Sequence, residues 1–226
     1  MRVTTLILTA LFCSTVFAQT NRTENKDFLY WQPKTEIQFS DFRKTLDSVD
    51  LKMIEKYKAK SLANIQIHAI LDYPKKAKQI KTLKEKWYIS PVFCKEYSPL
   101  LQQDSTELQK ARIYFDIAEY CSRITRKKIA SLETEKLVKD SNGFIAAAFP
   151  GLIDKMYDLM FDMFSSYKRE VIIEKQPNAH NEWRKTVNQL LESTKDYSTS
   201  ENECNRFINN KPFSDEYKVT YELYGK

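Results

Sequence analysis

The stretch KARIYFDIAEYCSRITRK, residues 110–127, predicts the central element of the fold. Its apolar residues recur every three or four positions and form two neighbouring stripes: Leu108, Ala111, Phe115 and Ala118 in one, Ile113, Ile117, Cys121 and Ile124 in the other. A helix that is apolar over this width packs against other elements on two sides. Asp104 and Glu107 have the spacing of a capping box, and stop signals follow at 140–143. We therefore expect one long helix over residues 104–138.

Shorter segments before and after this helix complete the predicted fold. LANIQIHAIL, residues 62–71, alternates between two faces, which is typical of a strand. KWYISPVFCKEY, residues 86–97, predicts a second strand, and Pro91 within it suits an edge position or a bulge; we expect this strand to be the edge. Residues 28–39 contribute extended pieces, and helical spacing follows Pro150 and again over about 180–195. The class is α+β: a small antiparallel or mixed sheet packed on the long helix, with two further helices.

The first nineteen residues, MRVTTLILTALFCSTVFAQ, read as a secretory signal with a basic start and a short apolar stretch. We expect cleavage after Ala18, so that residues 1–18 are the signal peptide and the mature protein is secreted or periplasmic. Residues 19–27 form a polar leader. The main domain covers 28–195, and 196–226 is a polar tail in which YKVTYELY predicts a final strand. No segment of the mature chain is expected to span a membrane.

Composition excludes several classes of function. The net charge is +6, but the lysines are scattered among acidic residues, so we expect no nucleic-acid partner. The chain has only three glycines, Gly143, Gly151 and Gly225, which excludes the closely spaced glycines of a phosphate loop or a dinucleotide fingerprint. We therefore expect no cofactor.

Three cysteines remain after signal cleavage, and an odd number in an oxidising compartment predicts one disulfide and one free thiol. Cys121 lies on the apolar face of the long helix and is the candidate free thiol. A bridge between Cys94 and Cys204 would then tie the polar tail to the main domain, although spacing alone leaves the pairing open.

Three segments in order carry a resemblance to a known family: Trp31 followed by IQFSDF at 37–42, FDIAE at 115–119 with a basic run after it, and 167–173 followed by Trp183. They resemble the bacterial family catalogued as domain of unknown function 922, whose members look like secreted zincin-type metallopeptidases. The likeness spans about 28–195 and implies a zincin-like fold.

The same likeness implies that the metal chemistry has been lost. The family carries H-E-x-x-H just before FDIAE and a further histidine in its closing element. Here those vestigial-site positions are held by Lys110, Ala111, Tyr114 and Ile173. An ammonium repels a dication, alanine cannot take a proton, and a neutral phenol is a poor ligand. We expect no catalytic residue and no metal ligand, which makes this a degenerate member.

Besides a purely structural or accessory subunit that uses the methionine-rich helix after Pro150, two functional hypotheses follow. The first is a non-catalytic protein with a binding or accessory role in the cell envelope, which holds a protein or peptide beside the 86–97 strand in a cleft that includes Glu119, Trp87 and Tyr88. The alternative is an active hydrolase or metallopeptidase with displaced ligands, for instance His68 or His180 with Glu119. The oligomeric state stays open.

Overall fold

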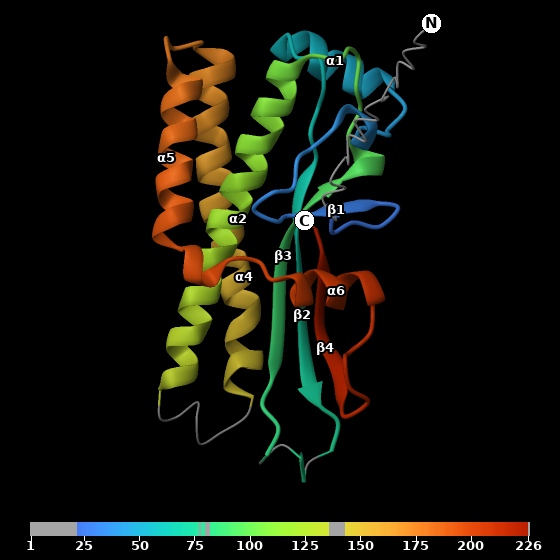
Figure 1. Cartoon of the computed structure of the whole chain (residues 1–226), viewed down its shortest axis with the longest axis vertical. Coiled ribbons are helices and arrows are strands. Elements are labelled where there is room, and N and C mark those ends of the chain that lie inside the picture. Colours follow the sequence, from blue (N-terminus) through green and yellow to red (C-terminus); the bar gives the residue numbers. More distant parts are fainter. Residues whose placement is uncertain (1–21, 77, 80–81, 136–142, 226) are drawn as a thin grey trace, which may run out of the picture.

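The computed structural model describes residues 22–76, 78–79, 82–135 and 143–225, and over these residues it is α+β. Four strands form one antiparallel sheet in the order β1-β3-β2-β4 (Figure 1). They are β1 (Phe28–Tyr30), β2 (Ile65–Pro74), β3 (Lys86–Cys94) and β4 (Tyr217–Tyr224). The predicted signal peptide and its cleavage site lie outside the described residues.

Strand β2 forms because its side chains alternate between the two faces of the sheet. Ile67, Ala69 and Leu71 are fully buried on one face, and His68 and Ile70 are buried on the other, as predicted. The predicted 28–39 strand is much shorter, because residues after Tyr30 leave the sheet and 39–41 form a 3-10 turn. The strand predicted in the tail is present as β4, which pairs with β2.

The expectation that the 86–97 strand lies at an edge is wrong, because β3 lies between β1 and β2. Pro91 stands opposite Ile67. Ile67 turns its carbonyl away from β3 and accepts a hydrogen bond from the N–H of Gly225 at its other edge. Ile67 and Pro91 are therefore a pair that exchanges no backbone hydrogen bonds. For this reason the missing N–H of proline is tolerated inside the sheet.

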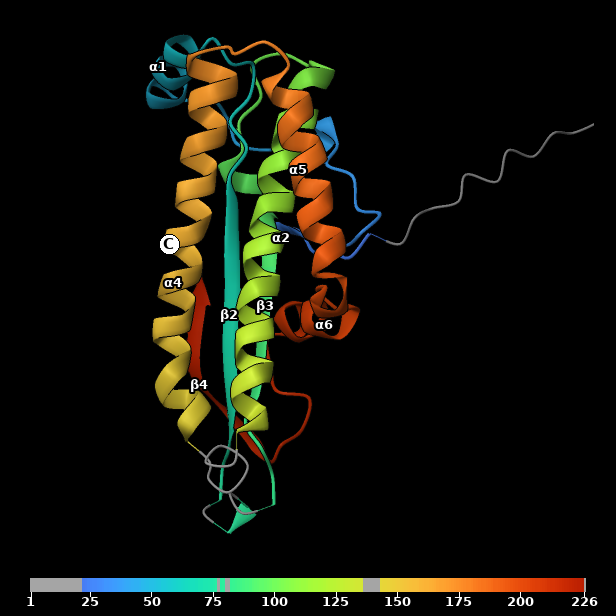
Figure 2. The same ribbon diagram turned by 90° about the vertical axis from the view of Figure 1, so that its left-hand side faces the viewer.

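The long helix is α2 (Ser105–Thr134), and the side chain of Asp104 caps its start. Its predicted end near residue 138 lies outside the described residues. Figure 2 shows α2 and α4 (Phe144–Tyr167) covering one face of the sheet, with α5 (Ala179–Ser193) packed against α2. These are the two further helices that the sequence predicts, but α4 begins at Phe144, so the prediction that this helix follows Pro150 is wrong and the proline lies inside it. Between α4 and α5 the chain forms a π-helix, η4 (Lys168–Ile173).

Two short helices complete the described part of the chain. Helix α1 (Ser48–Tyr57) precedes β2, and α6 (Glu201–Asn209) lies over the second face of the sheet. Phe207 and Cys204 of α6 pack there with Ile70 and Val92. The polar tail is thus part of the folded body. No helix in the described part of the chain combines the length and apolar content that a membrane span requires.

The predicted disulfide is absent from the structure, which has Cys94, Cys121 and Cys204 as free, buried thiols. Cys94 and Cys204 belong to the same apolar cluster, but the Cys204 sulfur lies 3.3 Å from the Gln32 amide nitrogen, which donates to it. Burial raises the pKa of each of the three thiols to about 12. Buried neutral thiols of this kind behave as small apolar side chains.

Candidate functional site

A pocket of about 220 Å³ lies beside the first half of α2. Its walls come from four parts of the chain: the end of α1, the segment that leads into β2, one face of α2, and η4. The lining residues are Met53, Tyr57, Ala59, Ser61, Leu62, Ala63, Glu107, Lys110, Ala111, Tyr114, Lys168 and Ile172. The volume is below the 300–1,000 Å³ of sites for drug-sized molecules, so the pocket suits one or two side chains.

Three of the four vestigial-site positions face this pocket. Lys110, Ala111 and Tyr114 line it from α2, where Tyr114 is one helical turn from both of the others. The fourth prediction, Ile173, is wrong, since its side chain is 58% exposed and its neighbour Ile172 lines the pocket instead. Ile172 and Ile173 belong to the π-helix, whose wider turn changes which residue faces inward.

An ion pair occupies the floor of the pocket. The Lys110 ammonium lies 2.7 Å from a carboxylate oxygen of Glu107, and the Ser61 hydroxyl donates to the other oxygen at 3.4 Å. Glu107 is 7% exposed, so its charge needs this partner. The Glu107 carboxylate therefore already neutralises the Lys110 ammonium inside the pocket.

Tyr114 closes the deep end of the pocket as an apolar ring. Its ring packs edge-on against Phe164 and Tyr167, with centroids 4.9 and 5.0 Å away. Burial raises the pKa of the Tyr114 phenol above its usual value, so the side chain stays neutral and cannot act as a phenolate ligand.

Lys168 and Tyr57 meet on the other side of the pocket. The Lys168 ammonium lies 3.9 Å from the centre of the Tyr57 ring. Its hydrogen bond and charge lower the pKa of the Tyr57 phenol. The contact joins the end of α1 to η4, two elements that otherwise approach the pocket from different parts of the chain.

The segment from 61 to 63 presents an unused backbone edge. Leu62 donates to the Pro99 carbonyl, and Leu101 donates to that of Lys60. In this pattern the N–H and C=O of Ser61 point away from the segment around Leu100. The N–H and C=O of Ala63, two residues on, point the same way. Neither residue makes a backbone hydrogen bond within the described ranges. Both line the pocket, so this edge, and not β3, borders it.

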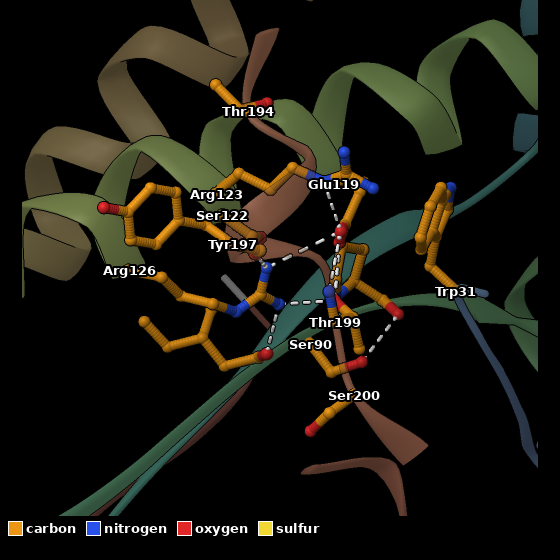
Figure 3. A network of polar contacts seen from close by, with 12 residues as sticks. Trp31, Ser90, Glu119, Ser122, Arg123, Arg126, Thr194, Tyr197, Thr199 and Ser200 are labelled. Atoms are coloured by element: carbon orange, nitrogen blue, oxygen red, sulfur yellow. Dashed lines mark hydrogen bonds and ion pairs between the residues drawn. The ribbon is translucent and has the colours of Figure 1, made fainter. Parts of the chain in front are cut away.

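The predicted cleft residues lie elsewhere. Glu119 is completely buried in a polar network (Figure 3), where it accepts hydrogen bonds from Arg123 at 2.7 Å and from the Thr199 N–H at 2.9 Å. Arg126 joins the network, donates to the Thr199 hydroxyl and to the Ile89 carbonyl of β3, and pairs with Glu203. Glu119 therefore secures the tail to α2 and does not reach a cleft.

Trp87 and Tyr88 are also misplaced by the sequence prediction. As neighbours in a strand they point to opposite faces of the sheet. Trp87 packs beside α2 and donates to Glu133 at 2.8 Å, whereas Tyr88 is buried on the face covered by α6. Neither lines the pocket.

The displaced-ligand arrangement is not formed either. His68 is fully buried among the rings of Phe28, Tyr30, Phe207 and Tyr224, and burial lowers its pKa to about 3. The Nδ1 atom of His180 lies 3.0 Å from the Tyr167 hydroxyl. Within the residues that the structure describes, no three histidine, cysteine or acidic side chains are grouped so that they could hold a metal ion.

Comparison of the chain with protein-family models, with curated proteins and with solved structures finds no match. The zincin-like fold and the family resemblance therefore stay predictions from the sequence motifs.

Proposed function

We propose that this chain is a secreted or periplasmic, non-catalytic binding protein with a zincin-like fold, which takes an extended peptide of an envelope protein into the pocket beside α2. The observation that carries the proposal is the coincidence of this pocket with Lys110, Ala111 and Tyr114. Substitutions that remove ligands and base together leave a concave surface without the chemistry that the family resemblance implies.

The unused edge at 61–63 indicates what kind of ligand fits. Backbone N–H and C=O groups of an extended segment bind another extended chain through main-chain hydrogen bonds, and adjacent pockets then select its side chains. The edge of Ser61 and Ala63 lies against a pocket that suits one or two side chains. A peptide is therefore the ligand class that uses both features.

Strand β4 gives the geometry of such an added chain. It pairs with β2 from Pro74 to His68, and Gly225 bonds to Ile67 just beyond. Ser61 and Ala63 lie upstream on the same side of this strand line, where the described part of the chain supplies no strand partner. A bound peptide would pair with residues 61–63, on the same side of the chain on which β4 pairs with β2.

A peptide-display experiment tests the proposal. Random eight-residue peptides are enriched on the mature protein, and the enriched sequences are synthesised for affinity measurement with two variants. Ala59→Trp places a large ring in the pocket, and Ala147→Trp adds the same ring at an exposed position of α4. We expect Ala59→Trp to weaken binding at least tenfold and Ala147→Trp to leave it unchanged.

The same experiment can refute the proposal in two ways. Failure to enrich any peptide, or equal affinities for the two variants, would contradict peptide binding in this pocket. Mass spectrometry of the peptides after prolonged incubation tests the non-catalytic part, because cleavage that the Ala59→Trp variant abolishes would reveal an enzyme.

A further inference from the structure

The two lysines of the pocket differ in their partners. Lys110 is neutralised by Glu107 at 2.7 Å. Lys168 has no carboxylate partner among the described residues, and the contacts of its ammonium are with the side chain of Tyr57. The charges that line the pocket therefore sum to one uncompensated positive charge, located at Lys168.

Apolar side chains also line the pocket that contains Lys168. Met53, Leu62 and Ile172 contribute side chains to the same pocket. A ligand that complements this surface carries one negative group for the ammonium and one compact apolar group for these side chains. The size of the pocket limits that apolar group to about one residue.

The contact between Tyr57 and Lys168 lies in the wall of the same pocket that Ser61 and Ala63 line. It joins α1 to η4, with the ammonium 3.9 Å from the ring centre. A peptide that lies beside Ser61 and Ala63 therefore borders the pocket that contains this ammonium. The C-terminal residue of such a peptide supplies both required groups at once, because its α-carboxylate and its side chain belong to one residue.

We infer that the pocket takes the C-terminal residue of a peptide, with the α-carboxylate bound by the Lys168 ammonium and the Tyr57 hydroxyl, and with an apolar last side chain against Met53, Leu62 and Ile172. An ammonium and a hydroxyl both donate to a carboxylate, and a charge-assisted hydrogen bond of this type is stronger than a neutral one. The inference rests on the proposed function and adds the polarity and the terminal chemistry of the ligand.

Two matched peptide pools test this inference. Both contain N-acetylated pentapeptides with four randomised positions and a final leucine; one pool ends in a free carboxylate and the other in an amide. Each pool competes with a fluorescein-labelled sample of the carboxylate pool for the mature protein. We expect the carboxylate pool to compete at least tenfold better than the amide pool.

Variants then assign the preference to its residues. Lys168→Met is expected to abolish the difference between the pools while retaining the affinity for the amide pool, which also shows that the variant is folded. Tyr57→Phe should reduce the difference in part. Lys185→Met, at an exposed position of α5, is the matched control and should behave as wild type.

Each other outcome has a distinct meaning. Binding of neither pool would contradict the proposed function together with the inference. Equal binding of both pools would refute the carboxylate site and leave peptide binding intact. A carboxylate preference that survives in Lys168→Met would show that Lys168 is not the group that recognises the peptide end.

Discussion

Lys110 and Glu107 form an ion pair one helical turn apart on the face of α2 that lines the pocket, with 2.7 Å between ammonium and carboxylate. The Glu107 side chain is 8% exposed and that of Lys110 is 29% exposed. The pair therefore keeps a mostly buried carboxylate in the wall of the pocket. Because Lys110 still contacts water, the ion pair stabilises the fold less than a fully dry one would. Lys110 therefore has a structural role in the wall of the pocket.

We expect Lys110→Ala to lower the free energy of unfolding by about 1–2 kcal/mol, because among the described residues it leaves the Glu107 carboxylate with the Ser61 hydroxyl as its remaining side-chain hydrogen-bond donor. Adding Glu107→Gln to this variant removes the unpaired charge and should restore at least half of the loss. Urea unfolding at pH 7 measures both, with Lys185→Ala as the exposed control. Additive losses in the double variant would show that the pair is not coupled.

The buried network around Glu119 should be far more sensitive. Arg126→Met leaves Glu119, which is 0% exposed, without one of its two cationic neighbours, and removes the donors to Ile89, Tyr197 and Glu203. Breaking one side of a buried charge network costs about 3–5 kcal/mol. Lys127→Met changes the next, exposed residue and should cost less than about 0.5 kcal/mol. Similar urea midpoints for the two variants would contradict this role of Arg126.

The long periodic elements were predicted from the sequence, whereas two short helices were not. The stripes of α2 extend over several turns, and the alternation in β2 covers seven residues, so each pattern favours one conformation. Helices α1 and α6 are only 10 and 9 residues long and were missed, although each has a capping box, Asp47 with Asp50 and Ser200 with Glu203. Those boxes are the signal that could have revealed them.

The candidate site shows the same limit. Lys110, Ala111 and Tyr114 were placed together correctly because helical spacing fixes their common face. Ile173 was misplaced by one residue because the sequence gives no sign of the π-helix that carries it. Glu119 was wrongly assigned to a cleft because its partner Thr199 comes from the tail, 80 residues later in the chain. No local pattern reveals such a long-range contact.

His68 should make stability depend on pH. Burial lowers its pKa in the folded state to about 3, whereas an unfolded histidine titrates near 6.5. The unfolded chain therefore binds a proton that the folded chain excludes between these values. The stabilising contribution of neutral His68 is complete above pH 6.5 and is lost as the pH falls towards 3, by up to about 1.4 kcal/mol per pH unit.

His68→Leu is expected to remove this dependence. Neither ring nitrogen of His68 has a hydrogen-bond partner within the described part of the chain, so leucine loses no bond seen there and removes two buried polar atoms. Urea unfolding at pH 7, 6, 5 and 4 should show a flatter profile for the variant than for wild type, with equal or higher stability at pH 7. Parallel profiles for the two proteins would indicate that His68 is not the group that titrates.

The last prediction concerns zinc. We expect the mature protein, purified without a histidine tag, to contain well below one zinc ion per chain and to melt at the same temperature with and without added zinc.

Zinc needs three or four nitrogen, sulfur or carboxylate ligands in near-tetrahedral positions. At the vestigial site, Lys110 is paired with Glu107 and Tyr114 stays neutral in a cluster of rings. A site with a Kd of roughly 1 µM would add about 2.7 kcal/mol at roughly 100 µM free zinc, which a melting curve detects easily. The double variant Lys110→His, Tyr114→His places two histidines four residues apart on the same helix face, next to the Glu107 carboxylate that Lys110 no longer neutralises. These three candidate ligands make the variant the positive control, because its melting temperature should rise with zinc. Near-equimolar zinc in the wild-type protein, with a melting temperature that falls on chelation and recovers when zinc returns, would overturn the non-catalytic reading and restore the metallopeptidase alternative.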